Sequence, residues 1–199
     1  MIGNFIHIKP NMNQFFNLFI TLCLAVFCSG CIHIETESAE DFKTWSVVPI
    51  PSCNINVFLD TNIWKLTTYN TDPCLFGENS NWGNENFTSS FNVVMQLKHE
   101  GFTDNETEFK QVISLLTKRY GESLEIKKLY ETNSADSVPT FIGEYIMTNE
   151  DQLTMMTTAM YFGNQEVAMC TFKTLPEFKE KMDDFADTFL YNFKMETRK

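Results

Sequence analysis

Apolar residues follow a helical spacing in two segments of the chain. In the first, five of them recur at i, i+3, i+4, i+7 and i+11 and form one stripe along a helix: Phe109, Val112, Ile113, Leu116 and Tyr120. The second begins at Thr174, which forms a capping box with Glu177 around Pro176 in the first turn. Its stripe consists of Phe178, Met182, Phe185 and Phe189. We therefore predict two amphipathic helices.

Other segments have the β-branched and aromatic residues that are typical of strands. A first hairpin is predicted from Ile55–Leu59 and Ile63–Tyr69, which flank a turn-like Asp-Thr-Asn sequence. Residues 72–90 are dense in Asn, Gly and Ser and predict a loop, and Phe91–Leu97 predicts a further strand. Between the two helices, four runs separated by turn signals predict an antiparallel meander: Leu124–Glu131, Thr140–Thr148, Leu153–Phe162 and Glu166–Phe172.

The order of these elements predicts the fold class. Leu190–Lys194 regains strand character and closes the chain. Strands are grouped before and between the helices, and regular β-α-β alternation is lacking. We expect an α+β fold in which an antiparallel sheet, made of the hairpin and the four-stranded meander, packs against both helices.

The beginning of the chain has the pattern of an export signal. Phe15–Phe27 is almost wholly apolar, but its 13 residues are too few to span a bilayer core, which needs about 20. Ser29-Gly30-Cys31 follows and resembles a bacterial lipobox, with Cys28 in place of the usual Leu. We therefore expect a lipoprotein signal peptide at 1–30, a lipidated Cys31 followed by a short acidic tether at 31–44, and one domain at 45–199.

Two other interpretations of this segment remain open. They are ordinary secretion with cleavage near Gly30 and an uncleaved anchor. Acyl chains such as palmitate on Cys31 would give stable membrane attachment, because two or more chains bind where one is marginal. Ile32 follows Cys31 where an Asp would signal retention in the inner membrane. The expected location is the bacterial cell envelope, at the outer membrane and facing the periplasm.

The charge of the chain argues against nucleic acid as a partner. It has 15 Lys and Arg against 26 Asp and Glu, a net charge of −11. Residues 1–30 contain Lys9 and no acid, so the remainder has 14 bases and 26 acids, or −12. Binding to phosphate draws on clustered bases, which this sequence lacks.

Three cysteines remain after Cys31. Cys53 and Cys74 flank the predicted hairpin of an exported chain, and a disulfide closing their 21-residue separation would stabilise the fold by about 3 kcal/mol. The alternative is a pair of free thiols. Cys170 lies in an apolar run typical of a buried strand, where a thiol behaves as a small apolar group.

No sequence motif predicts catalysis, a metal or a cofactor. Nucleophile-elbow, phosphate-loop and zinc-protease patterns are absent from the sequence. His99 stands at a strand end, where a solvated or structural histidine is expected. Asp183, Asp184 and Asp187 are placed mainly on the solvent face of their helix. The methionines of the meander favour core packing, with a copper groove as the weaker alternative.

Three aromatic residues stand out in the predicted loop: Phe76, Trp82 and Phe87. Aromatic side chains on turn-rich backbone often mark a contact surface, so we predict that these residues bind a partner. They could equally fold back as a lid over the sheet.

Several landmarks together resemble the PsbP-like fold group, which includes the DcrB-type bacterial lipoproteins. They are Trp64 in TNIWKL, the NVVMQL strand, the FIGEYIM, LTMMTTAMYF and EVAMCTF meander, and the closing helix with Phe185, Phe189 and Phe193. The resemblance covers about 45–195. It implies an accessory role in the assembly or stabilisation of membrane-associated complexes, and it supplies no active-site residues.

Two hypotheses for the function follow. The first is a non-enzymatic, membrane-anchored lipoprotein that acts on an envelope protein partner. The second is a periplasmic carrier or sensor that binds a small apolar ligand between the sheet and a helix.

We expect Cys31→Ser to abolish the incorporation of labelled fatty acid and to leave an uncleaved precursor, because the acylated thiol directs processing. Growth with labelled fatty acid followed by electrophoresis tests this. Equal labelling of the variant and the parent chain would contradict lipidation at Cys31.

Overall fold

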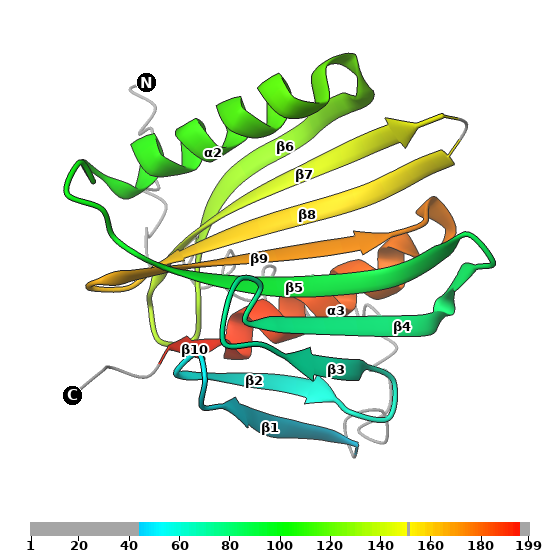
Figure 1. Ribbon diagram of the computed structural model, residues 1–199, viewed down its shortest axis with the longest axis horizontal. Coiled ribbons are helices and arrows are strands. Elements are labelled where there is room, and N and C mark those ends of the chain that lie inside the picture. Colours follow the sequence, from blue (N-terminus) through cyan, green and yellow to red (C-terminus); the bar gives the residue numbers. More distant parts are fainter. Residues whose placement is uncertain (1–43, 151, 196–199) are drawn as a thin grey trace, which may run out of the picture. The chain divides into compact units, whose positions relative to one another are not determined.

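The computed structural model describes residues 44–150 and 152–195. Two antiparallel sheets and two α-helices make up this part of the chain (Figure 1). The expected signal peptide and Cys31 lie outside the described residues. Thr44–Lys199 forms one compact unit. Among the described residues, no helix has the length and apolar character needed to cross a membrane.

The larger sheet has seven strands in the order β3-β4-β5-β9-β8-β7-β6. The predicted four-stranded meander is present as β6 to β9, and its last strand pairs with β5. The strands span β3 Lys65–Thr68, β4 Leu75–Asn84, β5 Phe87–Leu97, β6 Leu124–Asn133, β7 Pro139–Asn149, β8 Gln152–Phe162 and β9 Glu166–Thr174.

The smaller sheet has the order β1-β2-β10. Its strands are β1 Trp45–Ile50, β2 Ile55–Asp60 and β10 Lys194–Met195. The predicted first hairpin is therefore wrong in its pairing, because β2 pairs with β1 and β10 while β3 pairs with β4. The turn after Asp60 is present, and Asp60 Oδ1 accepts a hydrogen bond from the Asn62 N–H at 2.8 Å. Trp64, just after that turn, is buried in the core, and the chain leaves the first sheet there.

The loop predicted at 72–90 is also wrong, since most of it forms β4 and the start of β5. Its small and polar residues are needed inside the sheet. A Cβ on Gly77 would lie 2.1 Å from the Phe91 ring, so only glycine fits beneath that ring. Asn79 and Ser89 are buried, and the Ser89 hydroxyl lies 2.8 Å from the Thr174 hydroxyl. Pairing of β4 with β3 and β5 thus overrides the local turn chemistry.

Both predicted helices are present. α2 spans Asn105–Tyr120, and α3 spans Lys179–Asn192 after a short 3₁₀ turn, η2 Pro176–Phe178; a second such turn, η1 Gly121–Ser123, follows α2. Asp104 caps α2, and its Oδ1 accepts a hydrogen bond from the Thr107 N–H at 2.9 Å. Hydrogen bonds from the backbone and side chain of Thr107 hold the pKa of the Asp104 carboxyl below its usual value.

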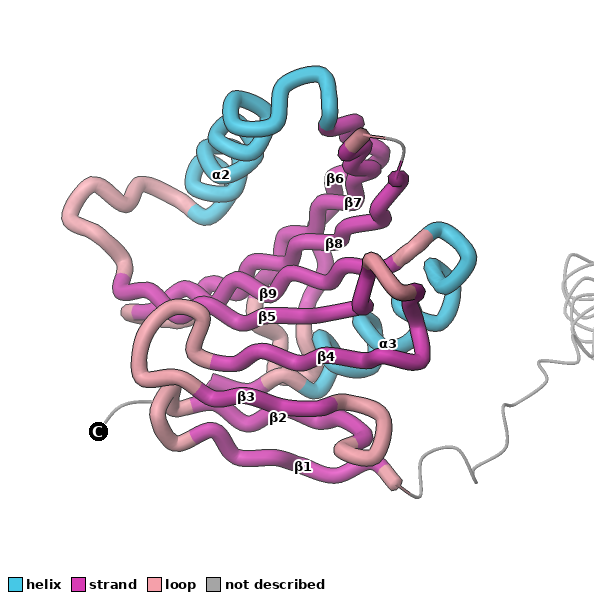
Figure 2. Tube along the Cα trace, turned by 45° about the vertical axis from the view of Figure 1, so that its right-hand side comes forward, coloured by secondary structure: helices cyan, strands magenta, loops and turns pink. Residues whose placement is uncertain are grey.

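An aromatic cluster forms the main core, between α3, the smaller sheet and one face of the larger sheet (Figure 2). The Phe185 ring centroid lies 4.5 Å from that of Trp64 and 5.5 Å from that of Phe91. Phe189 and Phe172 extend the cluster, with centroids 5.5 Å apart. Each of these five rings is almost wholly buried. The cluster therefore fixes α3 against both sheets.

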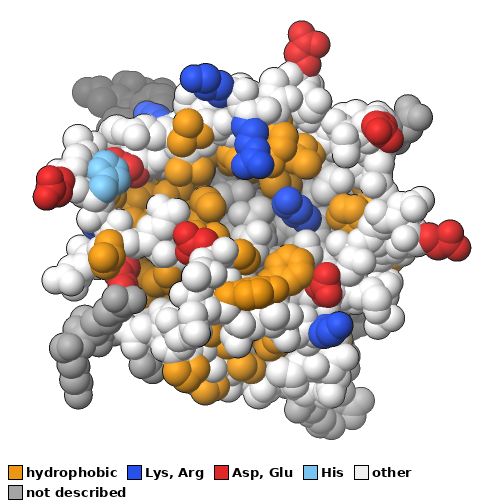
Figure 3. All heavy atoms as spheres, viewed as in Figure 1, with side chains coloured by type: hydrophobic (Ala, Val, Ile, Leu, Met, Phe, Trp, Pro, Cys, Tyr) orange, Lys and Arg blue, Asp and Glu red, His pale blue; other side chains and the backbone are white. Residues whose placement is uncertain are grey.

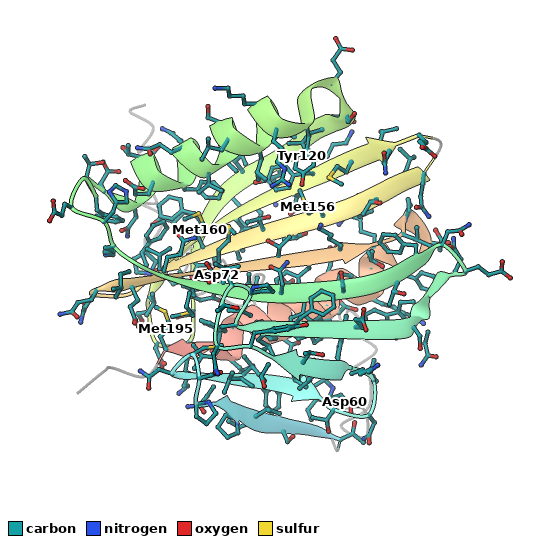
Figure 4. All side chains as sticks on the ribbon, in the orientation of Figure 1. Asp60, Asp72, Tyr120, Met156, Met160 and Met195 are labelled. Atoms are coloured by element: carbon teal, nitrogen blue, oxygen red, sulfur yellow. The ribbon has the colours of Figure 1, made fainter. Side chains whose placement is uncertain are left out.

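A second core lies on the opposite face of the larger sheet, under α2. Phe109 and Ile113 of α2 pack there with Met156 and Met160 of β8 (Figure 4). α2 packs on β6 and β7 and leaves the other half of this face without a described helix (Figures 1 and 2). We call that half the open face. Its side chains come from β3, β4, β5 and β9: Lys65, Thr67, Phe76, Glu78, Ser90, Asn92, Val94, Thr171 and Lys173.

Strand register assigns these residues to one face. Glu78, Ser90 and Lys173 lie in a cross-strand row that continues through Met156 and Tyr145, which pack under α2. Side chains in a strand alternate between faces, so the rows two residues away share that face. One such row runs Phe76, Asn92, Thr171, Thr158, Gly143 across five strands.

Candidate functional site

The structure separates the three aromatic residues predicted to bind a partner. Phe76 is half-buried on the open face. Trp82 packs edge-on against buried Trp64, with ring centroids 5.6 Å apart, and so belongs to the main core. Phe87 is half-buried at the β4–β5 turn, opposite Asn84. These residues form strands of the sheet itself, so neither a loop surface nor a lid describes them.

The open face combines one aromatic ring with mostly neutral polar groups. Phe76 lies next to Asn92 in the register, and Asn92 lies next to Thr171. In the space-filling view, hydrophobic side chains lie among neutral and charged ones around a shallow hollow (Figure 3). An aromatic ring with polar neighbours is a typical composition for a protein contact surface.

The three described cysteines lie in the main core as buried free thiols. Burial is the main cause that raises the pKa of the Cys74 thiol, and a hydrogen bond with the Cys53 thiol raises it further. Burial likewise raises the pKa of Cys170 well above its usual value. The hydrogen bond makes Cys53 and Cys74 neighbours, which fits the predicted disulfide, but the bond itself stays a prediction.

Peptide mapping without reduction is expected to find Cys53 cross-linked to Cys74 in protein isolated from an oxidising compartment. Alkylation of the native protein is expected to leave Cys170 unmodified, because a buried thiol with a raised pKa forms little thiolate. A control with reduced, denatured protein should label Cys53, Cys74 and Cys170. A mapped bond that includes Cys170 would overturn this pairing.

A cleft of about 210 Å³ lies between α3 and the larger sheet. Asp183 and Asp187 line it, while Asp184 and Asp187 are exposed, so the prediction that these aspartates lie mainly on the solvent face of the helix holds. The other residues of the cleft are Lys128, Tyr130, Ile142, Glu144, Thr157, Ala186 and Leu190. Because three carboxylates and an ammonium group line the cleft, it does not suit the apolar ligand expected between sheet and helix.

The charges of this cleft perturb one another. Partial burial raises the pKa of Asp187, and repulsion from Asp183, Asp184 and Glu144 adds to the effect, while Lys179 opposes it. Burial and the negative charge of Glu144 raise the pKa of Tyr130 to about 12. The Lys128 ammonium lies 4.2 Å from the centre of the Tyr130 ring, and Lys179 forms an ion pair with Asp183. The negative charge of Asp187 is therefore disfavoured in the folded protein.

We expect Asp187→Asn to stabilise the protein at neutral pH. The carboxyl has a higher pKa in the folded than in the unfolded chain, so its ionisation lowers stability as pH rises through that folded pKa. The gain is a few tenths of a kcal/mol, since water screens this exposed group. Urea unfolding at several pH values measures it.

The gain from Asp187→Asn should disappear at low pH, where the parent carboxyl is protonated in both states. Glu180→Gln is the matched control, because it removes the same charge from the first turn of α3, where a negative charge is favourable. This control should not raise stability. A gain that is constant from acid to neutral pH would contradict the electrostatic explanation.

A larger pocket of about 490 Å³ lies at the end of the larger sheet. It is lined by residues of the β6–β7 loop, of the β8–β9 turn with the strand ends beside it, and of the segment that ends in β10. Its apolar side chains are Val138, Pro139, Tyr161, Phe162, Phe193 and Met195, beside polar residues of the two turns. This volume lies within the usual range for small-molecule sites.

His99 has a structural contact. Its Nε2 lies 3.1 Å from Glu108 Oε2, which ties the segment after β5 to α2. Within residues 44–150 and 152–195, no group of three or more His, Cys, Asp or Glu side chains is arranged to hold a metal ion.

Comparison with known proteins identifies the fold. No family model matches the sequence, and no curated protein matches it either. The cyanobacterial PsbP of Synechocystis superposes with a TM-score of 0.59 and 8% identity, over 76% of this chain and 92% of that one. LpqN of Mycobacterium tuberculosis, described as involved in cell envelope biogenesis, gives 0.55 and 8%, over 72% and 83%. The Ran-binding protein Mog1p of Saccharomyces cerevisiae gives 0.53 and 12%, over 76% and 95%.

The PsbP-like α+β fold is thus confirmed. Identities of 8–12% show the fold alone, and the finer likeness to DcrB-type lipoproteins stays a prediction.

Proposed function

We propose that this protein is a non-enzymatic cell-envelope lipoprotein, anchored through Cys31, that acts as an accessory or assembly factor by binding a protein partner. The open face of the larger sheet is the observation that carries the proposal. It presents half-buried Phe76 among polar side chains, most of them neutral and a few charged, such as Glu78 and Lys173, with no described helix above it. The PsbP-like fold, shared with an envelope-biogenesis protein of Mycobacterium tuberculosis, supports this role.

The position of Phe76 suits binding more than stability. Its ring lies outside both hydrophobic cores, whereas Trp82, in the same strand, packs against Trp64. A half-buried aromatic ring such as that of Phe76 retains some apolar area that a partner can cover, and such residues often dominate binding energy. Neutral neighbours such as Asn92 and Thr171 add hydrogen-bonding capacity at low desolvation cost.

The pocket at the sheet end favours a second candidate function. Its volume of about 490 Å³ and its aromatic lining suit a small, largely apolar ligand, as a carrier or sensor would bind. The location differs from the expected one between sheet and helix. Native mass spectrometry of the purified protein separates the two functions, because a co-purifying small molecule favours the carrier.

Photo-cross-linking tests the proposed contact surface. We expect benzoylphenylalanine in place of Phe76 to give a discrete adduct with an envelope protein in cells. We also expect Phe76→Ala to lower co-purification of that protein about thirtyfold or more if the ring is a hot spot worth about 2 kcal/mol.

The matched control is the same probe in place of Tyr191, an aromatic residue of α3 that is 61% exposed. An adduct specific to position 76 supports the proposal. Equal adducts at both positions, or co-purification that Phe76→Ala leaves intact, would rule out the open face as the binding surface.

A further inference from the structure

β6 is the last strand of the larger sheet and pairs only with β7 among the described strands. It is ten residues long, and nearly all of its side chains are exposed. Ile126 and Leu129, on the α2 face, are 39% and 45% exposed. An edge of this length offers a row of backbone N–H and C=O groups that another strand can pair with.

The two halves of β6 differ. An irregularity between Ile126 and Lys128 breaks the pairing with β7, and the Lys127 ammonium lies 2.5 Å from Glu125. Bulges and charged residues of this kind protect an edge against pairing. From Lys128 to Asn133 the register with β7 is regular. This second half is therefore the part that can accept another strand.

The acidic cleft under α3 adjoins this half of β6. Lys128 and Tyr130 belong to β6 and line the cleft together with Glu144 of β7. Asp183 and Asp187 of α3 form the opposite wall. The cleft thus contains three carboxylates and one ammonium group, a net charge of −2 when all are ionised.

The positive charges nearby have other partners. Lys179 pairs with Asp183, and the Lys128 ammonium lies over the Tyr130 ring. Among the described residues, Asp187 has no ion pair. A cation placed beside Asp187 and Glu144 would relieve their mutual repulsion.

We propose that the second half of β6 binds an extended peptide segment of a protein partner as an added strand, with a Lys or Arg side chain of that segment entering the cleft beside Asp187. This inference rests on the proposed function and names the partner's chemistry. Backbone pairing along β6 supplies affinity, and the acidic cleft selects the basic side chain.

The geometry of strand addition supports this assignment. Alternate side chains of an added strand fall on the α3 side of the sheet, next to Lys128 and Tyr130. Adjacent strands lie about 4.8 Å apart, so an added strand would lie about 9.6 Å from β7, and the long stem of Lys or Arg extended across β6 would meet the Glu144 side chain that reaches toward it. The charge of the cleft and the unpaired edge thus favour the same occupant.

The test uses the purified full chain and a fluorescent peptide, acetyl-(Thr-Lys)₄-amide, at about 0.15 M salt. We expect saturable binding that protects the β6 amides from hydrogen exchange. The double variant Asp187→Asn, Glu144→Gln should weaken binding about fivefold or more, as expected for loss of partly exposed charge pairs. Glu180→Gln, on α3 outside the cleft, should leave binding within about twofold.

Two further peptides complete the test. A Thr-Glu peptide should not bind, and a Thr-Lys peptide with alternate N-methylated amides should lose binding because it cannot pair along an edge. Equal binding of the N-methylated peptide, no binding of the Thr-Lys peptide, or no effect of the double variant overturns the proposal. Phe76 lies on the opposite face of the sheet, so Phe76→Ala should leave peptide binding unchanged. A failure of the β6-edge proposal can therefore be distinguished from a failure of the open-face proposal.

Discussion

The aromatic cluster around Phe185 is the contact on which the rest of the structure depends. Its ring contacts Trp45 of the smaller sheet and Phe91 and Phe172 of the larger sheet, so one side chain of α3 joins both sheets. Burial of a Phe ring is worth about 3 to 5 kcal/mol against alanine, a large part of the stability of a single domain. Without this cluster, α3 would have no fixed position, and the cleft beside it would not form.

The elements that could be predicted from the sequence are those with local causes. The stripe of Phe109 and Ile113 depends on residues a few positions apart, and both helices are present. The capping box predicted at Thr174 is wrong, because Thr174 ends β9 and its hydroxyl pairs with Ser89, so the second helix starts later, at η2 and α3. The loop prediction at 72–90 failed because its causes are distant. Gly77 is required by Phe91, and Ser89 contacts Thr174, which is 85 residues away. The sequence of a loop rich in turn residues and the sequence of a strand rich in glycine cannot be told apart without knowing the partner strand.

The same distinction between local and distant causes explains which parts of the candidate surfaces could be predicted from the sequence. Phe76 was singled out as an aromatic residue in polar sequence, but the signal was equally strong for Trp82, whose contact with Trp64 depends on the fold. Asp183 and Asp187 were correctly predicted on the solvent side of their helix, but helical periodicity describes only the helix and could not show that they also line a cleft. They line the cleft together with Ala186 and Leu190 of the same helix and with residues of the sheet. The acidic side chains at this edge of α3 line a cleft only because strands such as β6 and β7 lie opposite them.

The two proposed surfaces follow from one property of the sheet. Each helix covers part of one face: α2 packs over β6 and β7, and α3 packs on the other face against β9 and the first sheet. The strands that α2 leaves uncovered carry Phe76, and the strand that α3 leaves uncovered is the edge strand β6. Because successive side chains of a strand point to opposite faces, a substitution on the open face does not alter the side chains that line the cleft. The two proposed surfaces therefore occupy separate parts of one small domain, so each proposal can be tested without disturbing the other.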